Sequence, residues 1–403
     1  MAKNDEQSER APAKERLPDV GLLEIVGQDS AVARLEEGLG GARRPHAYIF
    51  AGPQGVGRRT TAIAMAKTLL CERPEKRGLR PISSAKSVSV PDFQACGVCA
   101  DCKMFAGGSH PDFHLIYKEL AAYHEDSQVR DRVMQELGIP VIRSFLIDAA
   151  ARRAARGRGK VFVVLEAELM SPAAQNALLK TLEEPPPGVT IILVAEQPEQ
   201  LLPTTLSRCR MVRFGPLPRE FVARKLAEQG APPPEAAFWA AFTDGSVGRA
   251  ARLRARGMYE VKTDMIARIA AMNRAGDADL GEELHKQTES LAEDLVKATR
   301  TEQTEMSKSL AVRQTTGMML ELIAAAYRDA ITLASRAQRE IVYADQRPAV
   351  AAIAAKFDLA QLASIIEQLS EFERLLWRNV NAKNIWYNVV ITCASAAPLT
   401  VGE

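Results

Sequence analysis

The sequence lacks any run of roughly twenty consecutive apolar residues, the length that a membrane-spanning helix needs, so we expect no membrane partner. It also lacks an excess of charge of one sign, because 52 Lys and Arg residues face 50 Asp and Glu residues and leave a net charge of only +2. Nothing in this balance marks the chain as a general binder of nucleic acid or of membrane surfaces. Residues 1–20 are polar and charged without the apolar stretch of a signal peptide, which predicts a disordered tail and a cytoplasmic location.

Three of the six cysteines follow one another at intervals of three residues: Cys96, Cys99 and Cys102. In a cytosolic chain such tight spacing is typical of a metal site rather than of disulfide bonds. Zinc prefers four ligands in a tetrahedron, and four protein ligands leave no open coordination position. We therefore predict a structural zinc site with Cys71 as the fourth ligand. His110 and His114 compete for that place, and free thiols are the alternative to a metal.

The chain of 403 residues is long for a single domain, and its length alone predicts two or three. From about residue 22 to residue 214, short apolar runs alternate with helical patterns, which is typical of a parallel sheet covered by helices on both faces. Three runs are predicted as buried strands: Ala47–Ala51, Val161–Leu165 and Val189–Ala195. Residues 72–94 and 119–135 interrupt this alternation and are interpreted as surface insertions.

The helix that follows residue 170 has clear boundaries, since Ser171-Pro172 predicts its start and the run 185–188 its end. Strand patterns stop near residue 215, and the remaining sequence is helical. The fold class is therefore α/β in the first part and helical in the second. The predicted domains are a disordered tail over 1–20, an α/β core with the zinc module over 21–215, a small helical domain over 216–257 and a larger helical bundle over 258–403.

A glycine-rich loop between the strand 47–51 and a helical pattern over 60–70 is the most informative stretch. Its glycines are Gly52, Gly55 and Gly57. In the working pattern G-x-x-x-x-G-K-[ST], backbone amides cradle phosphates, the lysine reaches the terminal phosphates and the hydroxyl holds magnesium. Here Arg58 and Arg59 stand at the lysine and hydroxyl positions, and arginine cannot ligate a metal cation. Thr60 offers a hydroxyl only after a shift of one residue, so the loop keeps its shape without its usual chemistry.

An acidic pair after a buried strand is the second element of a nucleotide-hydrolysing site, because the Asp holds the metal and the Glu orients water. After the strand 161–164, Leu165 stands where the Asp is expected and Glu166 follows. Glu166 is retained as a candidate residue of the altered nucleotide site. The equal alternative is that Glu166 and Glu168 begin a solvated turn.

The motif Ser207-Arg208-Cys209 follows a strand and a turn, and three residues are a weak signal by themselves. Arg208 has an ordinary explanation as a salt-bridge partner. Cys209 has one as a small buried apolar residue.

Several longer motifs together resemble the bacterial clamp-loader subunits of DNA polymerase III, which are AAA+ proteins. These motifs are His46–Gly52, the cluster Cys96, Cys99 and Cys102, His110-Pro111-Asp112, Asn176–Pro186 and Leu206–Cys209. The resemblance covers about residues 22–249 well and the helical remainder in outline. It implies an AAA+ P-loop core, a helical lid and a C-terminal collar domain that joins sister subunits.

Within that family the ATP-hydrolysing gamma or tau subunit keeps the lysine, the threonine and the acidic pair, whereas the delta-prime subunit has lost them. This chain departs in the delta-prime direction at Arg58, Arg59 and Leu165. It departs again at Arg249, because the family's ATPases place a sensing arginine one residue earlier. The resemblance implies a delta-prime-type subunit with no ATPase activity of its own. The loop's amides remain, so the sequence leaves open whether a nucleotide or a phosphate still binds.

In the family, the arginine of the serine-arginine-cysteine motif reaches across a subunit interface to the neighbour's ATP. The resemblance assigns this role of arginine finger to Arg208, with Ser207 beside it, and such a finger stabilises transition-state charge. The implied partners are the gamma/tau and delta subunits and, through the assembled complex, the sliding clamp and primer-template DNA. Two alternatives remain: an active gamma/tau-type ATPase that uses Arg58 and Thr60, and a zinc-stabilised scaffold with no role at a neighbour's site.

Overall fold

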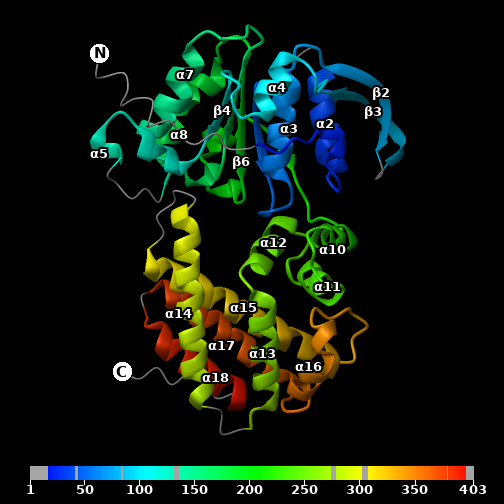
Figure 1. Ribbon diagram of the computed structural model, residues 1–403, viewed down its shortest axis with the longest axis vertical. Coiled ribbons are helices and arrows are strands. Elements are labelled where there is room, and N and C mark those ends of the chain that lie inside the picture. The colour runs from blue at the N-terminus through cyan, green and yellow to red at the C-terminus, as the bar shows by residue number, and fades with distance from the viewer. Residues whose placement is uncertain are drawn as a thin grey trace. The chain divides into compact units, whose positions relative to one another are not determined.

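The computed structural model describes residues 17–40, 44–82, 85–130, 136–273, 278–301, 307–378 and 380–395. The chain forms two compact units, Met1–Pro218 and Arg219–Glu403 (Figure 1). Residues 1–16 of the predicted tail lie outside the described residues. Leu17 is buried and Asp19 forms an ion pair with Lys67, so the packed part of the chain begins before the predicted boundary at residue 21.

The first unit is built on a five-stranded parallel sheet with the strand order β4-β5-β6-β1-β7. Its strands are β1 (Ala47–Ala51), β4 (Phe113–Ile116), β5 (Lys160–Val164), β6 (Val189–Ala195) and β7 (Arg210–Arg213). The three predicted strands are confirmed as β1, β5 and β6, which are buried along their whole length as central strands of a parallel sheet are. The edge strands β4 and β7 are partly exposed, so neither gives a continuous apolar run in the sequence.

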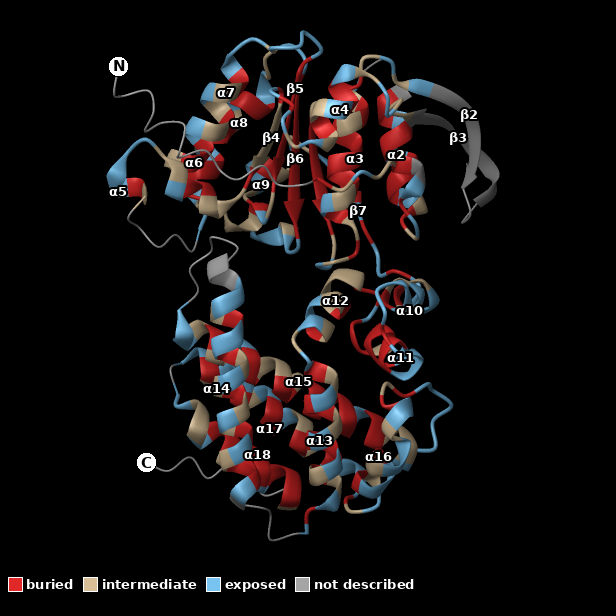
Figure 2. Cartoon of the chain, viewed as in Figure 1, coloured by how far each residue is buried: buried red, intermediate tan, exposed pale blue. Residues whose placement is uncertain are grey.

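Helices cover both faces of the sheet (Figure 2), which confirms the predicted fold class. One face carries α2 (Asp29–Gly40) and α3 (Arg58–Leu70), and the other carries α6 (Ile139–Ile142), α7 (Asp148–Ala151) and α8 (Pro172–Glu183). On the second face Leu146 and Leu178 pack against Ile49, Phe162 and Ile191 of the sheet. Each such buried side chain contributes about 1.5–3 kcal/mol to folding. The shorter elements of this unit are η1 (Leu22–Glu24), α4 (Ala100–Ala106), η2 (Lys118–Tyr123), α5 (Ser127–Arg130), η3 (Arg143–Ile147), η4 (Ala167–Leu169), η5 (Pro198–Gln200) and α9 (Pro203–Leu206).

Helix α8 has the predicted ends. The Ser171 hydroxyl oxygen accepts the backbone N–H of Ala174 at 3.2 Å, and Pro172 is the first helical residue. The helix ends at Glu183, just before the proline run. Glu183 thus occupies the last helical position, where its side chain is exposed to solvent.

The structure corrects the interpretation of residues 72–94 and 119–135 as simple surface insertions. Residues 72–94 are more than a loop, because β2 (Glu75–Ile82) and β3 (Ala85–Gln94) pair there as a two-stranded antiparallel sheet. Residues 119–135 are only partly on the surface, since Leu120, Ala121 and Val129 are buried in the core of the sheet's second face. The sequence did not reveal these core residues, because they are few and lie among many polar ones. Residues 131–135 lie outside the described part.

The second unit is helical throughout its described residues, as the sequence predicts. Its helices are α10 (Arg219–Glu228), α11 (Pro233–Phe242), α12 (Val247–Ala255), α13 (Met258–Ala271), α14 (Ala278–Thr301), α15 (Lys308–Ala334), η6 (Ala344–Gln346), α16 (Arg347–Ala354), α17 (Leu359–Trp377) and α18 (Ala382–Ser395). This unit contains both predicted helical domains. In the described ranges no single helix is long and apolar enough to cross a membrane; only the segments Ala344–Ala354 and Leu359–Trp377, bent by 113°, reach that composition together.

Candidate functional site

The glycine-rich loop joins the end of β1 to the first residue of α3, which begins at Arg58, two residues before the predicted start. Gly52 has a φ of 149°, and a Cβ there would collide with the carbonyl oxygen of Phe214. Gly55 and Gly57 have φ values of 77° and 101°, which glycine adopts at no steric cost. The three glycines therefore stand where the backbone takes conformations that other residues rarely adopt.

The buried side chain of Gln28 fixes this loop to the chain that leaves β7. Its amide nitrogen donates to the carbonyl oxygens of Val56 at 3.1 Å and Gly215 at 2.7 Å, and its oxygen accepts the Gly215 N–H at 3.1 Å. Only 4% of Gln28 is exposed, so these bonds satisfy its buried amide group and the buried carbonyl oxygen of Val56. Sequence reasoning missed this residue, because a lone glutamine next to a glycine carries no distinctive pattern.

Arg58, at the lysine position, is buried, and the charges of two acidic side chains of its own chain act on it. Burial lowers the pKa of Arg58, and the nearby carboxylates of Glu196 and Glu168 oppose that shift. One Glu168 oxygen accepts the N–H of Glu196 at 2.9 Å, while the other is buried without a hydrogen-bond partner among the described residues. The cation at the lysine position is thus buried, and the charges of two acidic side chains of the same chain act on it.

The two residues after Arg58 do not rebuild a magnesium site. Arg59 is exposed and Thr60 is half-buried in the first turn of α3. The buried hydroxyl of this turn belongs to Thr61, and it donates to the carbonyl oxygen of Gly57 at 2.9 Å. That hydroxyl closes the helix turn, an ordinary role for a threonine within a helix.

Glu166 lies in the turn after β5 with a φ of 47°, the left-handed region. Its side chain is 48% exposed and pairs with Lys118 at 3.3 Å. Leu165, which precedes it, has no side-chain oxygen that could hold a cation. Glu166 therefore has the surroundings of a solvated turn, the alternative that the sequence left open.

Arg208 follows helix α9, and its guanidinium is held by its own chain. Its Nε donates to Glu183 at 2.6 Å, and a second nitrogen pairs with the same carboxylate. The remaining nitrogen donates to the carbonyl oxygen of Thr204 at 2.9 Å and to the Ser207 hydroxyl at 3.3 Å. The ordinary salt bridge considered for Arg208 is therefore present, on a side chain that is still 32% exposed.

The sulfur atoms of Cys71, Cys96, Cys99 and Cys102 all lie within 4.8 Å of one another. The Cys71 sulfur is 3.5 Å from that of Cys96 and 3.9 Å from that of Cys99, close to the roughly 3.8 Å between ligands of a tetrahedral zinc with bonds near 2.3 Å. Burial raises the pKa of Cys71 and of Cys102, so a bound cation is what would keep both as thiolates. The four residues fit a metal ion such as zinc.

The two competing histidines have other surroundings. His110 is buried, its Nδ1 accepts the N–H of Asp112 at 3.1 Å, and its Nε2 lies 3.6 Å from Asp101. Burial lowers its pKa, although Asp101 and Asp112 oppose the shift. His114 stacks on Phe162 with ring centres 4.6 Å apart. Neither histidine belongs to the four-sulfur group.

Two buried carboxylates connect the cysteine module to the loop before β5. Asp112 accepts the backbone N–H groups of Ala155 at 2.7 Å and Arg156 at 2.8 Å. Asp101, next to Cys102, accepts from the Arg156 Nε at 2.7 Å. The acidic residue of the His110-Pro111-Asp112 motif thus has a structural use, which is to hold this loop.

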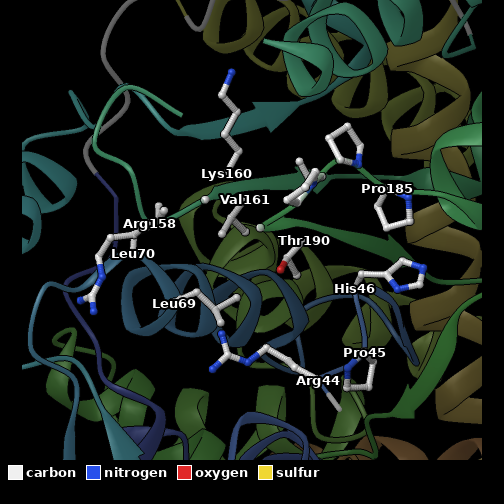
Figure 3. Close-up of a pocket in the computed structure, with 15 residues that line it drawn as sticks. Arg44, Pro45, His46, Leu69, Leu70, Arg158, Lys160, Val161, Pro185 and Thr190 are labelled. Atoms are coloured by element: carbon white, nitrogen blue, oxygen red, sulfur yellow. The ribbon is translucent and has the colours of Figure 1, made fainter. Parts of the chain in front are cut away.

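A pocket of about 450 Å³ lies at the amino-terminal ends of the central strands β1, β5 and β6 (Figure 3). Its lining includes Arg44, His46, Arg158 and Lys160 and no carboxylate. Lys160 points away from Thr190, and its ammonium donates to the carbonyl oxygen of Ala149 at 2.7 Å (Figure 3). None of the residues predicted for the nucleotide site, the arginine finger or the metal lines this pocket.

Arg249, the residue beside the expected sensor position, is engaged within the second unit. It pairs with Glu321, and its guanidinium lies 5.3 Å from the centre of the Phe242 ring. These contacts give it a structural use inside that unit.

The chain matches two family models. The model described as "DNA polymerase III, delta subunit" matches residues 27–218, and the model described as "DNA polymerase III, delta subunit, C terminal" matches residues 282–388. A DNA polymerase III subunit delta' of Pseudomonas aeruginosa is 34% identical over 235 residues, which are 57% of this chain and 62% of that protein. The chain therefore spans less than two thirds of this relative.

Two further relatives differ in coverage. A DNA polymerase III subunit delta' of Bacillus subtilis is 25% identical over 350 residues, or 87% of this chain and 91% of that protein. The DNA polymerase III subunit tau of Escherichia coli is 33% identical over 205 residues, or 51% of this chain and 27% of tau. The similarity to the delta' subunit of Bacillus subtilis thus extends well into the helical part, beyond the region shared with tau.

Proposed function

We propose that this chain, a delta-prime-type member of the DNA polymerase III clamp-loader subunits, completes a neighbour's ATPase site without working as an ATPase itself. Its proposed task is to organise the clamp loader while sliding clamps are loaded during DNA replication. Its proposed partners are the gamma/tau and delta subunits and, through the complex, the clamp and primer-template DNA. The proposed location of this role is the cytoplasm.

The observation that carries the proposal is the buried guanidinium of Arg58 at the lysine position, whose pKa is lowered by burial and raised by the charges of Glu196 and Glu168. A working site needs a cation that is free to meet phosphates, and a metal held by a hydroxyl and an Asp. Here the cation is the buried guanidinium of Arg58, on which the charges of Glu196 and Glu168 act, and Leu165 stands where the Asp is expected. Two carboxylates beside the loop also repel a nucleotide's phosphates. These features support a retained but catalytically silent loop, and firm ATP binding is not part of the proposal.

Arg208 is the proposed contribution to the neighbour's site, as an arginine finger with Ser207 beside it. Its guanidinium is partly exposed, follows a short helix, and is held by three groups of its own unit. A planar guanidinium can donate two parallel bonds to a phosphate, which suits it to stabilise charge in phosphoryl transfer.

The cysteine cluster is proposed to hold a structural zinc ion. Four sulfur ligands leave no open position for catalysis, so the metal would supply stability alone. It would link the end of α3 at Cys71 to α4, which begins after Cys99. We also propose the domain division expected from the sequence: an AAA+ core over 21–215, a lid over 216–257 and a collar over 258–403.

Two assays test the proposed function. The isolated chain should neither bind Mg-ATP tightly nor hydrolyse it, and clear turnover would favour an active gamma/tau-type ATPase instead. In a loader reconstituted with the Arg208→Ala variant, the DNA-stimulated ATPase rate should fall by about tenfold or more, since an arginine finger can contribute 10³–10⁵ at one site. An unchanged rate would leave the chain as a zinc-stabilised scaffold.

A further inference from the structure

The guanidinium of Arg208 has almost no donor left for another molecule. An arginine offers five N–H groups. Glu183 takes the Nε–H and one N–H of a terminal nitrogen, while Thr204 and Ser207 take both of the other terminal nitrogen. A single N–H remains. A phosphate that is bound in the usual two-bond fashion needs at least two.

The contact with Glu183 is the one that an incoming phosphate can replace. The Glu183 carboxylate, like a phosphate, offers the guanidinium a negatively charged oxygen, and one of its oxygens pairs with both the Nε and a terminal nitrogen of Arg208. The pair is also near solvent, because 47% of the Glu183 side chain and 32% of the Arg208 side chain are exposed. Exposed pairs of this kind are weak, so their partners exchange readily.

The other two contacts have a different character. The Thr204 carbonyl oxygen is part of α9, and the Ser207 hydroxyl itself donates to that oxygen at 3.1 Å. Both groups are neutral and sit on the same short segment as Arg208. They can hold one terminal nitrogen of the guanidinium in place while the Nε and the other terminal nitrogen change their partner.

We propose that Glu183 is a regulatory positioning residue that holds Arg208 in a parked conformation, in place of the phosphate oxygens of a neighbour's nucleotide. This inference rests on the proposed function of Arg208. In the parked conformation the finger is withheld from the neighbour's site. It is released when the more highly charged phosphate is brought close enough to displace the Glu183 carboxylate.

A purely structural ion pair would have other consequences. It would join the last residue of α8 to the segment after α9 and contribute to folding alone. Removing either partner would then lower the melting temperature by a similar small amount. Loss of Glu183 would leave the ATPase rate of the assembled loader unchanged as long as the protein is folded.

The test uses the complete loader, reconstituted with the wild-type chain, Glu183→Gln, Arg208→Ala or the double variant. A matched control is Glu184→Gln, since Glu184 is the exposed neighbour of Glu183. The ATPase rate is measured without DNA and with primer-template DNA and clamp. We expect Glu183→Gln to raise the DNA-free rate about two- to fivefold, the range that an exposed ion pair accounts for. Its effect on the DNA-stimulated rate should be smaller.

The outcomes separate the two levels of the proposal. Glu184→Gln should leave both rates as they are, and Arg208→Ala should cancel the rise in the double variant. A DNA-free rate that stays level or falls in Glu183→Gln, while Arg208→Ala lowers the stimulated rate, overturns the parking role and leaves the finger intact. An unchanged rate in Arg208→Ala overturns the proposed function itself. Melting temperatures of all variants establish that each chain is folded.

Discussion

The ammonium of Lys262 lies 4.0 Å from the centre of the Phe238 ring, and this contact joins α13 to α11 inside the second unit. The rings of Tyr259 and Tyr343 flank the same ammonium at 4.4 Å and 5.2 Å. Lys262 is completely buried and pairs with Asp345. A buried charge is tolerated only when it is paired and surrounded by compensating groups, as it is here.

Replacing Lys262 with Met should destabilise the protein by about 2–3 kcal/mol, because the cation–π contacts are lost and Asp345 keeps a charge without its main partner. Equilibrium unfolding in denaturant, followed by circular dichroism, measures the change. Lys286→Met is the matched control, since that side chain is 69% exposed and its change should stay within about 0.5 kcal/mol. Equal effects of the two substitutions would refute the role of the buried cage.

Gln28→Ala should cost about 2 kcal/mol, because the buried carbonyl oxygen of Val56 loses its partner and the two bonds to Gly215 are lost with it. Amide hydrogen exchange should increase in the glycine-rich loop and near residue 215. Gln128→Ala, on an exposed position of α5, serves as the comparison and should be nearly neutral. Unchanged exchange in the loop would show that Gln28 does not fix it.

Removal of the metal should unfold the cysteine module. We expect one zinc ion per chain by elemental analysis, loss of that ion in Cys71→Ser, and destabilisation by several kcal/mol after chelation, since binding energy of a structural zinc is folding energy. Cys393→Ala is the control, because Cys393 is buried far along the chain in α18 and lies outside the four-sulfur group. That variant should keep its zinc. A wild-type chain that purifies without metal would contradict the assignment.

His114 should make the protein sensitive to acid. Burial lowers its pKa to about 4, with the charge of Lys160 as a further cause, whereas an unfolded chain takes up this proton near 6.5. The native state therefore keeps its full stability above about pH 6.5 and loses up to roughly 2–3 kcal/mol as the pH falls to 4. In His114→Phe the aromatic stacking on Phe162 is kept and the titration is gone. Its free energy of unfolding should change less between pH 7 and pH 4.5 than that of the wild type; equal changes would exclude His114 as the cause.

The sequence predicted the parts of the fold that depend on long uniform patterns. Strands β1, β5 and β6 are continuous apolar runs, and α8 carries its own start and stop signals, so all four were found. Strand β4 was missed because His114 and its neighbours are only half-buried at the sheet edge. Paired strands β2 and β3 were missed because a ribbon of two strands needs no apolar run.

The candidate site was predictable where spacing carries the signal and hidden where the partners come from distant segments. The glycine loop and the cysteine triplet are local patterns, and Cys71 was reached by its place at the end of a helix. Gln28 is bonded to Gly215, which is 187 positions away in the sequence. Glu183, at the end of α8, is bonded to Arg208, which follows α9. Glu196 was overlooked because only the folded sheet brings the residue after β6 to the end of β1. Such single polar residues have no periodicity that a sequence could reveal.

Restoring the glycine-rich loop alone should not create an ATPase. In Arg58→Lys with Arg59→Thr, the charges of Glu168 and Glu196 would still act at this position and would still oppose the approach of a phosphate. Leu165 would still offer no oxygen to magnesium, and Glu166 would still be paired with Lys118. Groups that act together in phosphoryl transfer are strongly non-additive, so two corrected positions should give no measurable turnover.

Turnover should appear only when the acidic side is rebuilt as well, with Leu165→Asp and Glu196→Ala added to the loop changes. Single-turnover hydrolysis of Mg-ATP by each purified variant measures this, and nucleotide binding followed by fluorescence separates a loss of affinity from a loss of chemistry. If the two loop substitutions alone produce hydrolysis, the internal carboxylates are not what silences the site. If Glu196→Ala alone restores nucleotide binding, the electrostatic balance around Arg58 is the decisive difference, because that variant leaves the loop backbone and the missing magnesium ligand unchanged.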